Sequence, residues 1–242
     1  MVRLFAIAAL LTTAALAQRF EVASVRPSSY QSNEGNGRES FQTSPDSLTV
    51  RNATLRAALS WAYRVQEFQV EGQSAALSDR FDIVAKAPGT ASIAQLRAML
   101  GALLQERFQF RFHRENQVQE AYALLVFKGK PKLRESKETG PGVFRPSKES
   151  MFAQHGDMWE FAGSLAGPLR MPVVDETGLT GRYDFMVDLL PYFPNSAKGA
   201  PLDLADIMKS ALRDQLGLTI EPRKESIKML VVDHVERLPS EN

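Results

Sequence analysis

The chain has 242 residues, of which 44% are hydrophobic and 24% charged, the composition of a globular protein. A formal net charge of +1 gives no broad field that would attract nucleic acid or an anionic membrane surface. The absence of cysteine excludes disulfides, thiolate nucleophiles and cysteine-ligated metals. Any functional site therefore has to be built from other side chains.

The first 17 residues have the pattern of a secretory signal peptide. Arg3 supplies the positive charge, residues 4–16 form an apolar run, and Ala15-Leu16-Ala17 is a small-residue cleavage motif. The apolar run is shorter than the roughly 20 residues that a membrane-spanning helix needs, and no later segment is predicted to span a bilayer. We expect cleavage near Ala17-Gln18 and export, to the periplasm or beyond; an uncleaved N-terminal anchor is the alternative.

The first half of the chain predicts strands and two amphipathic helices. Asn52 is a candidate N-cap for a helix with apolar residues at positions 55, 58, 59 and 62. Ser92 and Gln95 form a capping box before a second helix that extends to about Leu104. Strands are predicted at residues 20–27, 47–52, 67–72, 80–87, 108–113 and 121–129, the last two paired with each other.

The composition changes after residue 127. Residues 128–150 are charged and contain Pro and Gly without periodicity, which predicts a linker or a long surface loop. A helix limited by Pro168 and Pro172 follows. Asp203 and Gly217 are the expected N-terminal and C-terminal caps of the last helix. Strands are predicted at residues 218–222 and 227–236.

The two halves predict the same order of elements: helix, strand, strand, helix, strand, strand. Residues 77–83 align with residues 179–185, and residues 108–115 align with residues 218–225. The predicted fold class is α+β, with two related modules of mainly antiparallel sheets and helices packed on one face. The predicted domains are the signal peptide at 1–17, a first module at 18–127, the linker at 128–150 and a second module at 151–242.

Motifs for metal, nucleotide or nucleophilic chemistry are not found in the sequence. None of the three histidines, His113, His155 and His234, has a second histidine at metal-ligand spacing. The sequence lacks a G-x-S-x-G elbow, an S-x-x-K motif, a P-loop and a G-x-G-x-x-G motif. We therefore assign no catalytic, cofactor-binding or metal-binding residue, and expect no cofactor.

Carboxylates leave an enzymatic alternative open. Residues 175, 176, 184 and 188 are acidic, and a glycosidase uses a pair of carboxylates. Asp184 and Asp188 would lie about 13 Å apart along a strand, beyond either hydrolytic geometry. His155 near Asp157 is a further candidate, so the alternative is an envelope hydrolase that uses carboxylates with or without His155.

The densest polar stretch is "VVDETGLTGRYDF" at residues 173–185, which we interpret as a structural turn between two strands. Carboxylate and hydroxyl side chains would hold the turn backbone, two glycines would take a positive φ, and an arginine, an aromatic residue and an aspartate would start the next strand. The motif residues are Asp175, Thr177, Gly178, Gly181, Arg182, Tyr183 and Asp184, and the repeat counterparts are Arg80, Phe81 and Asp82. The alternative for the two arginines is an anion-binding pair; recurrence in both halves favours a structural role at the strand entrance.

Four stretches in this order resemble an uncharacterised "soil-associated" family of exported bacterial proteins: "FEVASVRPS", "LRAMLGALLQERFQFRFHRE", "DETGLTGRYDF" and "VVDHVERLPSEN". The resemblance covers nearly the whole mature chain, and "GSLAGPLRMPVVDE" departs from the family pattern. Because the family has no established activity, the resemblance implies no catalytic residue. Related domains fused to membrane-bound sensor peptidases imply an envelope sensing or binding role.

These observations favour a non-catalytic binding or interaction module of the cell envelope. The expected partner is an unknown envelope protein or ligand, and nucleic acid is not expected. Besides the hydrolase, a purely structural role in a larger assembly stays open.

Overall fold

The computed structural model describes residues 19–29, 39–129, 131–138, 140, 142–193 and 203–240. The predicted signal peptide and its cleavage site lie outside these described residues. Contacts between Cα atoms divide the chain into two compact units. Unit 1 contains the described residues within 19–65, 72–111 and 232–240, and unit 2 contains the described residues within 66–71 and 112–231. The predicted α+β class, with mainly antiparallel sheets, is confirmed.

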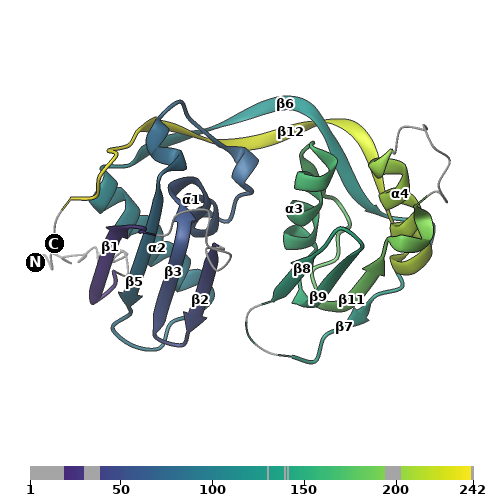
Figure 1. The fold of residues 1–242 in the computed structure, drawn as a ribbon, viewed down its shortest axis with the longest axis horizontal. Coiled ribbons are helices and arrows are strands. Elements are labelled where there is room, and N and C mark those ends of the chain that lie inside the picture. The colour runs from purple at the N-terminus through teal and green to yellow at the C-terminus, as the bar shows by residue number, and fades with distance from the viewer. Residues whose placement is uncertain are drawn as a thin grey trace, which may run out of the picture. The chain divides into compact units, whose positions relative to one another are not determined.

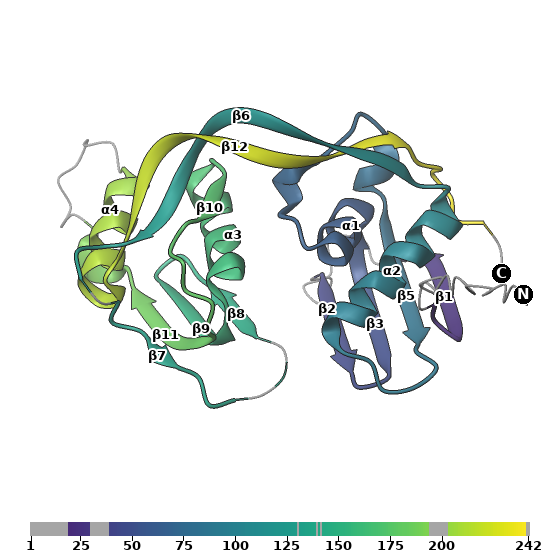
Figure 2. The ribbon, with the colours of Figure 1, turned by 180° about the vertical axis from the view of Figure 1, so that it is seen from behind.

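Unit 1 contains an antiparallel sheet whose described strands follow the order β1-β5-β3-β2. Side chains along β5 alternate between buried and more exposed, the pattern expected of a sheet covered on one face. Helices α1 and α2 lie against this sheet (Figure 2). The elements are β1 Val22–Pro27, β2 Ser40–Ser44, β3 Ser47–Thr54, α1 Leu55–Tyr63, a short 3-10 helix Ala75–Ser78, β5 Arg80–Lys86 and α2 Ile93–Phe108.

The ends of the unit 1 helices show one correct and one wrong prediction. The capping box of Ser92 and Gln95 at the start of α2 is confirmed. Helix α1 is capped by Thr54, whose hydroxyl accepts from the Ala57 N–H at 3.0 Å, and not by Asn52. Asn52 has a φ of 49°, a left-handed conformation that an N-cap does not adopt.

Unit 2 contains a second antiparallel sheet, with its described strands in the order β7-β11-β9-β8. The predicted caps Asp203 and Gly217 are confirmed at the two ends of the last helical segment, which finishes as a π-helical turn. The elements are β7 Arg134–Glu135, β8 Val143–Pro146, β9 Ser150–Gly156, α3 Met158–Leu169, β11 Tyr183–Asp188, a 3-10 turn Leu190–Tyr192, α4 Leu204–Ala211 and the π turn Leu212–Leu216 (Figure 1).

A further sheet has the order β10-β6-β12-β4 and is formed by two long strands with a short strand on each side. The long strands are β6 Arg111–Val126 and β12 Leu218–His234, which lie side by side in both views (Figure 1, Figure 2). The short strands are β10 Val173–Asp175, parallel to β6, and β4 Val70–Glu71, parallel to β12. The boundary between the units falls after Arg111 in β6 and after Val231 in β12.

The long strands differ from the paired strands that the sequence predicts. Residues 108–113 and 121–129 were expected to form two strands, and so were residues 218–222 and 227–236, but β6 and β12 are each continuous. The intervening residues 114–120 and 223–226 contain no glycine or proline, so nothing in the backbone chemistry imposes a turn. Residues 128–150 contain β7 and β8; such short edge strands need no apolar alternation.

The core of unit 2 lies where α3 and the last helix meet residues of both of its sheets. Phe161 is fully buried, with its ring edge-to-face against Phe185 at 4.8 Å between centroids. Burying one such side chain contributes about 1.5–3 kcal/mol. The same core includes Leu124 near the end of β6 and Ile220 near the start of β12, so these parts of the long strands belong to the packed interior of this unit.

Candidate functional site

The predicted turn motif begins at the edge strand β10. The Asp175 Oδ1 atom accepts from the Thr177 N–H at 3.0 Å and from the Thr177 hydroxyl at 2.7 Å. The Thr177 Oγ1 atom in turn accepts from the Leu179 N–H at 3.2 Å. Gly178 has a φ of 68°, which glycine adopts without steric cost. These side chains replace the backbone partners that a turn lacks.

Gly181 serves the turn in a different way from the positive φ that we expected. It is not among the described glycines with a positive φ. A Cβ atom at this position would lie 2.7 Å from the Tyr183 hydroxyl oxygen. The Tyr183 side chain is 7% exposed, so the absence of a side chain at Gly181 lets the tyrosine ring lie close to the turn backbone.

Arg182 and Asp184 hold a bulge in β9. The Asp184 Oδ1 atom accepts from the His155 backbone N–H at 2.8 Å, and Arg182 donates to the His155 carbonyl oxygen at 2.8 Å. His155 has a φ of 51°, and the register between β9 and β11 shifts at this point. Two residues later, Asp157 caps α3 by accepting from the Glu160 N–H at 2.8 Å.

The repeat counterpart in unit 1 makes the same contacts. The Asp82 Oδ1 atom accepts from the Asn52 backbone N–H at 2.8 Å, and Arg80 donates to the Asn52 carbonyl oxygen. The register between β3 and β5 shifts here, and Thr54 caps the following helix. Phe81 is buried, 3% exposed, and faces away from Asp82 as alternation in a strand requires.

We call these two arrangements the corners of the units. Each consists of a residue with positive φ, the residue after it, the helix cap, and an arginine and an aspartate from the neighbouring strand. The corner of unit 1 is Asn52, Ala53, Thr54, Arg80 and Asp82; the corner of unit 2 is His155, Gly156, Asp157, Arg182 and Asp184. The matched geometry supports the predicted duplication, which stays a prediction.

The carboxylates considered for acid–base chemistry are engaged separately. Glu176 pairs with Arg223 at 3.1 Å, and the Asp188 Oδ1 atom accepts from the Leu190 N–H at 3.0 Å. Hydrogen bonds from the His155 backbone N–H and then from the Ser136 hydroxyl hold the pKa of Asp184 below its ordinary value. Each carboxylate thus supports a local backbone or ionic contact.

His155 does not complete a pair with Asp184 through its ring. The contact to Asp184 is made by the His155 backbone, and the imidazole Nδ1 atom is buried without a hydrogen-bond partner. Asp157 lies 3.7 Å from Arg182 and caps α3. Among the described residues, no group of three His, Asp or Glu side chains is placed to hold a metal ion.

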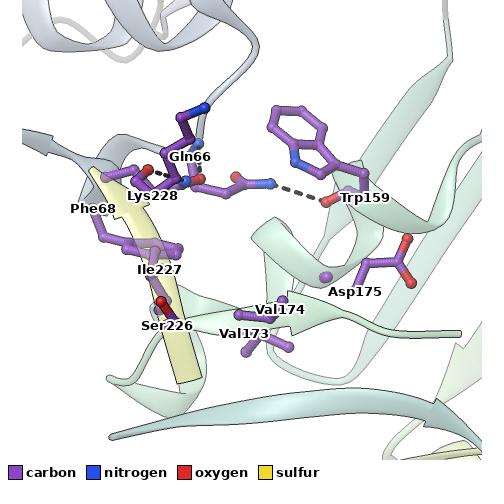
Figure 3. A pocket seen from close by; sticks show the side chains of 11 residues that line it. Gln66, Phe68, Trp159, Val173, Val174, Asp175, Ser226, Ile227 and Lys228 are labelled. Atoms are coloured by element: carbon purple, nitrogen blue, oxygen red, sulfur yellow. Dashed lines mark hydrogen bonds between the residues drawn. The ribbon is translucent and has the colours of Figure 1, made fainter. Parts of the chain in front are cut away.

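A pocket within unit 2 lies between α3, β10, β12 and the 3-10 helix Glu67–Gln69 (Figure 3). Its volume is about 180 Å³. Aromatic and aliphatic side chains line it together with two amides and a few polar groups. The lining residues are Gln66, Phe68, Gln69, Trp159, Ala162, Val173, Val174, Asp175, Ser226, Ile227 and Lys228.

The two glutamines are fixed by hydrogen bonds at the pocket. The Gln66 backbone N–H donates to the Gln69 Oε1 atom at 2.8 Å. The Gln66 side-chain amide donates to the Trp159 carbonyl oxygen at 2.9 Å (Figure 3), and that of Gln69 donates to the Lys228 carbonyl oxygen at 2.9 Å. A Cβ atom at Gly163 would overlap the Gln66 amide, so this glycine lets Gln66 lie against α3. Fixed polar groups beside an apolar wall are typical of small binding sites.

A protein-family model described as "Protein of unknown function (DUF3738)" matches residues 56–235, well over half of the chain. The chain belongs to the DUF3738 family. The predicted membership of an uncharacterised family is thereby confirmed. No curated protein and no solved structure was found to match the chain. The region matched by the DUF3738 model contains every residue that lines the pocket.

Most of the pocket of this DUF3738 protein was missed by sequence reasoning. Of the predicted motif residues, only Asp175 lines it, with its neighbours Val173 and Val174. Gln66 and Gln69 stand three residues apart, as in a capping box, but residues 67–72 were predicted to be a strand. That spacing was the one local signal for the two glutamine side chains.

Among the described residues, no helix is long and apolar enough to cross a membrane.

Proposed function

We propose that this protein is exported and acts as a non-catalytic binding module of the cell envelope, with its ligand site at the pocket of unit 2. The observation that carries the binding role is the pairing of an apolar wall with amides that are already oriented. Phe68, Val174 and Ile227 offer apolar surface, and Gln66 and Gln69 are held by hydrogen bonds. A preformed site pays little ordering entropy when a ligand binds.

Export is supported by the sequence of residues 1–17, with its single positive charge, apolar run and small-residue motif. Expression in a bacterium, followed by mass spectrometry of the exported fraction, tests it. We expect a mature protein that begins at Gln18. Replacing Ala15 and Ala17 with bulky residues should leave the precursor uncut, because signal peptidase sites require small residues. Full-length protein confined to the cytoplasm would contradict export.

The binding role can be tested with toluene, a probe that is apolar and small. Trp159 lines the pocket and Trp61 does not, and the chain has two tryptophans. The indole N–H resonance of Trp159 should therefore shift on titration while that of Trp61 stays in place. At a toluene concentration of about ten times Kd, linkage predicts a stabilisation of about 1.4 kcal/mol, which raises the Tm by about 3–6 °C.

A filling variant and a matched control sharpen this test. Val174→Phe places a larger side chain at the pocket wall and should abolish the toluene-induced shift of Trp159. Val84→Phe makes the same change on a strand of unit 1, at a side chain that is 52% exposed, and should leave the shift intact. If toluene leaves Trp159 unchanged in the unmodified protein, the pocket is not a binding site for apolar groups.

A further inference from the structure

The edge of β12 beside the pocket points to a ligand class, an inference that rests on the proposed binding site. We propose that the pocket takes one apolar side chain of an extended polypeptide segment, and that the backbone of this segment pairs with β12 at Ser226. The partner is then a protein that offers a short extended stretch with a central aliphatic or aromatic residue, added to the sheet as a further strand.

The backbone of β12 presents an edge at the pocket. Strand β4 pairs with β12 at Leu230 and Val231. The Lys228 carbonyl on this edge accepts from the Gln69 side-chain amide. Gln69 directly precedes β4, so this contact lies on the same side of β12 as β4. Backbone groups of alternate residues in a strand point to the same edge, so the N–H and C=O of Ser226 point there too. Within the described part of the chain, β4 is the last strand on this side.

The small volume of the pocket favours a ligand of which only one part enters the pocket. Sites for complete small molecules have volumes of roughly 300–1,000 Å³, whereas this pocket has about 180 Å³. One buried anchor side chain in a closely fitting hollow is the usual arrangement where a partner protein is held. The hollow and the strand edge meet at Ser226 and Ile227, so a single extended segment reaches both.

The charges at the pocket select against a strongly charged ligand. Its lining contains one carboxylate, Asp175, and one ammonium group, Lys228. The Asp175 carboxylate is already bonded to the Thr177 N–H and hydroxyl. With one charge of each sign, the rim provides no net attraction for a phosphate or an acidic peptide. Recognition therefore depends on the apolar wall of the pocket and on the backbone groups of β12.

Capped pentapeptides test the apolar anchor. The probes are Ac-Ser-Thr-Leu-Thr-Ser-NH2 and the same peptide with alanine in place of leucine, titrated while the Trp159 indole resonance is followed. The leucine peptide should bind about tenfold more tightly than the alanine peptide, because the leucine side chain buries more apolar surface. Equal affinity of the two peptides would overturn the proposal.

Backbone methylation tests strand pairing. Two further leucine peptides carry an N-methyl group, one on the leucine nitrogen and one on the following threonine nitrogen. Neighbouring N–H groups of a strand point to opposite edges, so one of the two peptides should lose about fivefold or more in affinity and the other should bind as before. Unchanged binding of both methylated peptides would exclude strand pairing.

A proline variant tests the backbone contact at Ser226, and comparing toluene with the peptides on the unmodified protein separates this inference from the proposed function. Ser226→Pro removes the N–H that would pair with the peptide, at an edge position where proline is tolerated. It should lose peptide binding, whereas Ser226→Ala, which retains the N–H, should keep peptide binding. Toluene binding without any peptide binding would overturn the peptide proposal alone. Failure of toluene and of every peptide would overturn the proposed function as well.

Discussion

The corners of the two units make the same backbone contacts with different residues. In each, an aspartate accepts from the N–H of a residue with positive φ at 2.8 Å, and an arginine donates to the carbonyl of that residue. That residue is Asn52 in unit 1 and His155 in unit 2, and the next one is Ala53 or Gly156. The arginine and the aspartate are therefore the constant part of the corner, because they form the hydrogen bonds to the N–H and C=O of the bulge residue. The residue types at the other positions differ with the packing around them.

The two tryptophans make this comparison measurable. Trp61 lies in α1 of unit 1, and Trp159 lies in α3 of unit 2. A Trp159→Phe variant leaves a fluorescence signal from unit 1 alone, and a Trp61→Phe variant leaves one from unit 2 alone. Urea unfolding followed in these two backgrounds assigns a loss of stability to one unit, even when the units do not unfold together.

The largest effect is expected for Gly156→Val. A Cβ atom at Gly156 would overlap the Phe144 ring, and that ring packs against Phe161 and Phe185. Overpacking of this kind costs about 3 kcal/mol, to be read from Trp159. The control at the equivalent position of unit 1 is Ala53→Gly, which should cost about 1 kcal/mol as read from Trp61. Equal costs at the two positions would contradict the packing difference between the corners.

The next effect is expected for Asp82→Ala. It leaves the N–H of Asn52 without its acceptor in a residue that is 4% exposed, which costs about 2 kcal/mol. Asp184→Ala should destabilise unit 2 in the same direction, since it removes the acceptor of the His155 N–H. The two aspartates share no hydrogen-bond partner among these contacts, so the effects should add in the double variant. Strong coupling between them would show that the corners are not independent.

A smaller effect is expected at the residue with positive φ. His155→Val should cost about 1–2 kcal/mol, because a β-branched residue is strained at a φ of 51°. His155→Asn should change the free energy of unfolding by less than about 0.5 kcal/mol, since asparagine tolerates this conformation and takes it at the matching position in unit 1. A large loss for His155→Asn would show that the imidazole itself is needed.

The smallest effect is a dependence on pH in unit 2. The folded pKa of Asp184 lies below its ordinary value of 3.8, so the charged form is favoured by folding. The resulting stability is present above the ordinary value and is lost as the pH falls through the folded pKa. The free energy of unfolding read from Trp159 should therefore fall in acid, and Asp184→Asn should flatten this fall. An identical pH profile for the variant would contradict the assignment.

The predicted fold was right where short-range chemistry decides it. Ser92, Asp203 and Gly217 cap helices as predicted because a cap needs only a side chain or a glycine next to the helix end. Asn52 was assigned to the wrong role because asparagine suits both an N-cap and a positive φ. The neighbouring strand that supplies Asp82 is 30 residues away, and local pattern does not show it.

The pocket was largely beyond prediction because it is assembled from distant segments. Gln66 meets Trp159 across 93 residues, and Gln69 meets Lys228 across 159 residues. In the sequence each of these side chains reads as an ordinary polar or aromatic residue. The sequence predicts Asp175 as a turn residue, and its position at the pocket follows from the pairing of β10 with β6.

The sequence by itself determined the α+β class, several helix ends, the uncharacterised family and the Arg-aromatic-Asp motif in both halves. These depend on the chemistry of neighbouring residues and on periodicity, which the chain displays directly. Only the tertiary structure decided that β6 and β12 are continuous, that Arg182 and Asp184 hold a bulge at His155, and that Gln66 and Trp159 share a pocket. Those features arise from hydrogen bonds between segments that are far apart in the chain. These hydrogen bonds form only when the strands pair in the correct register.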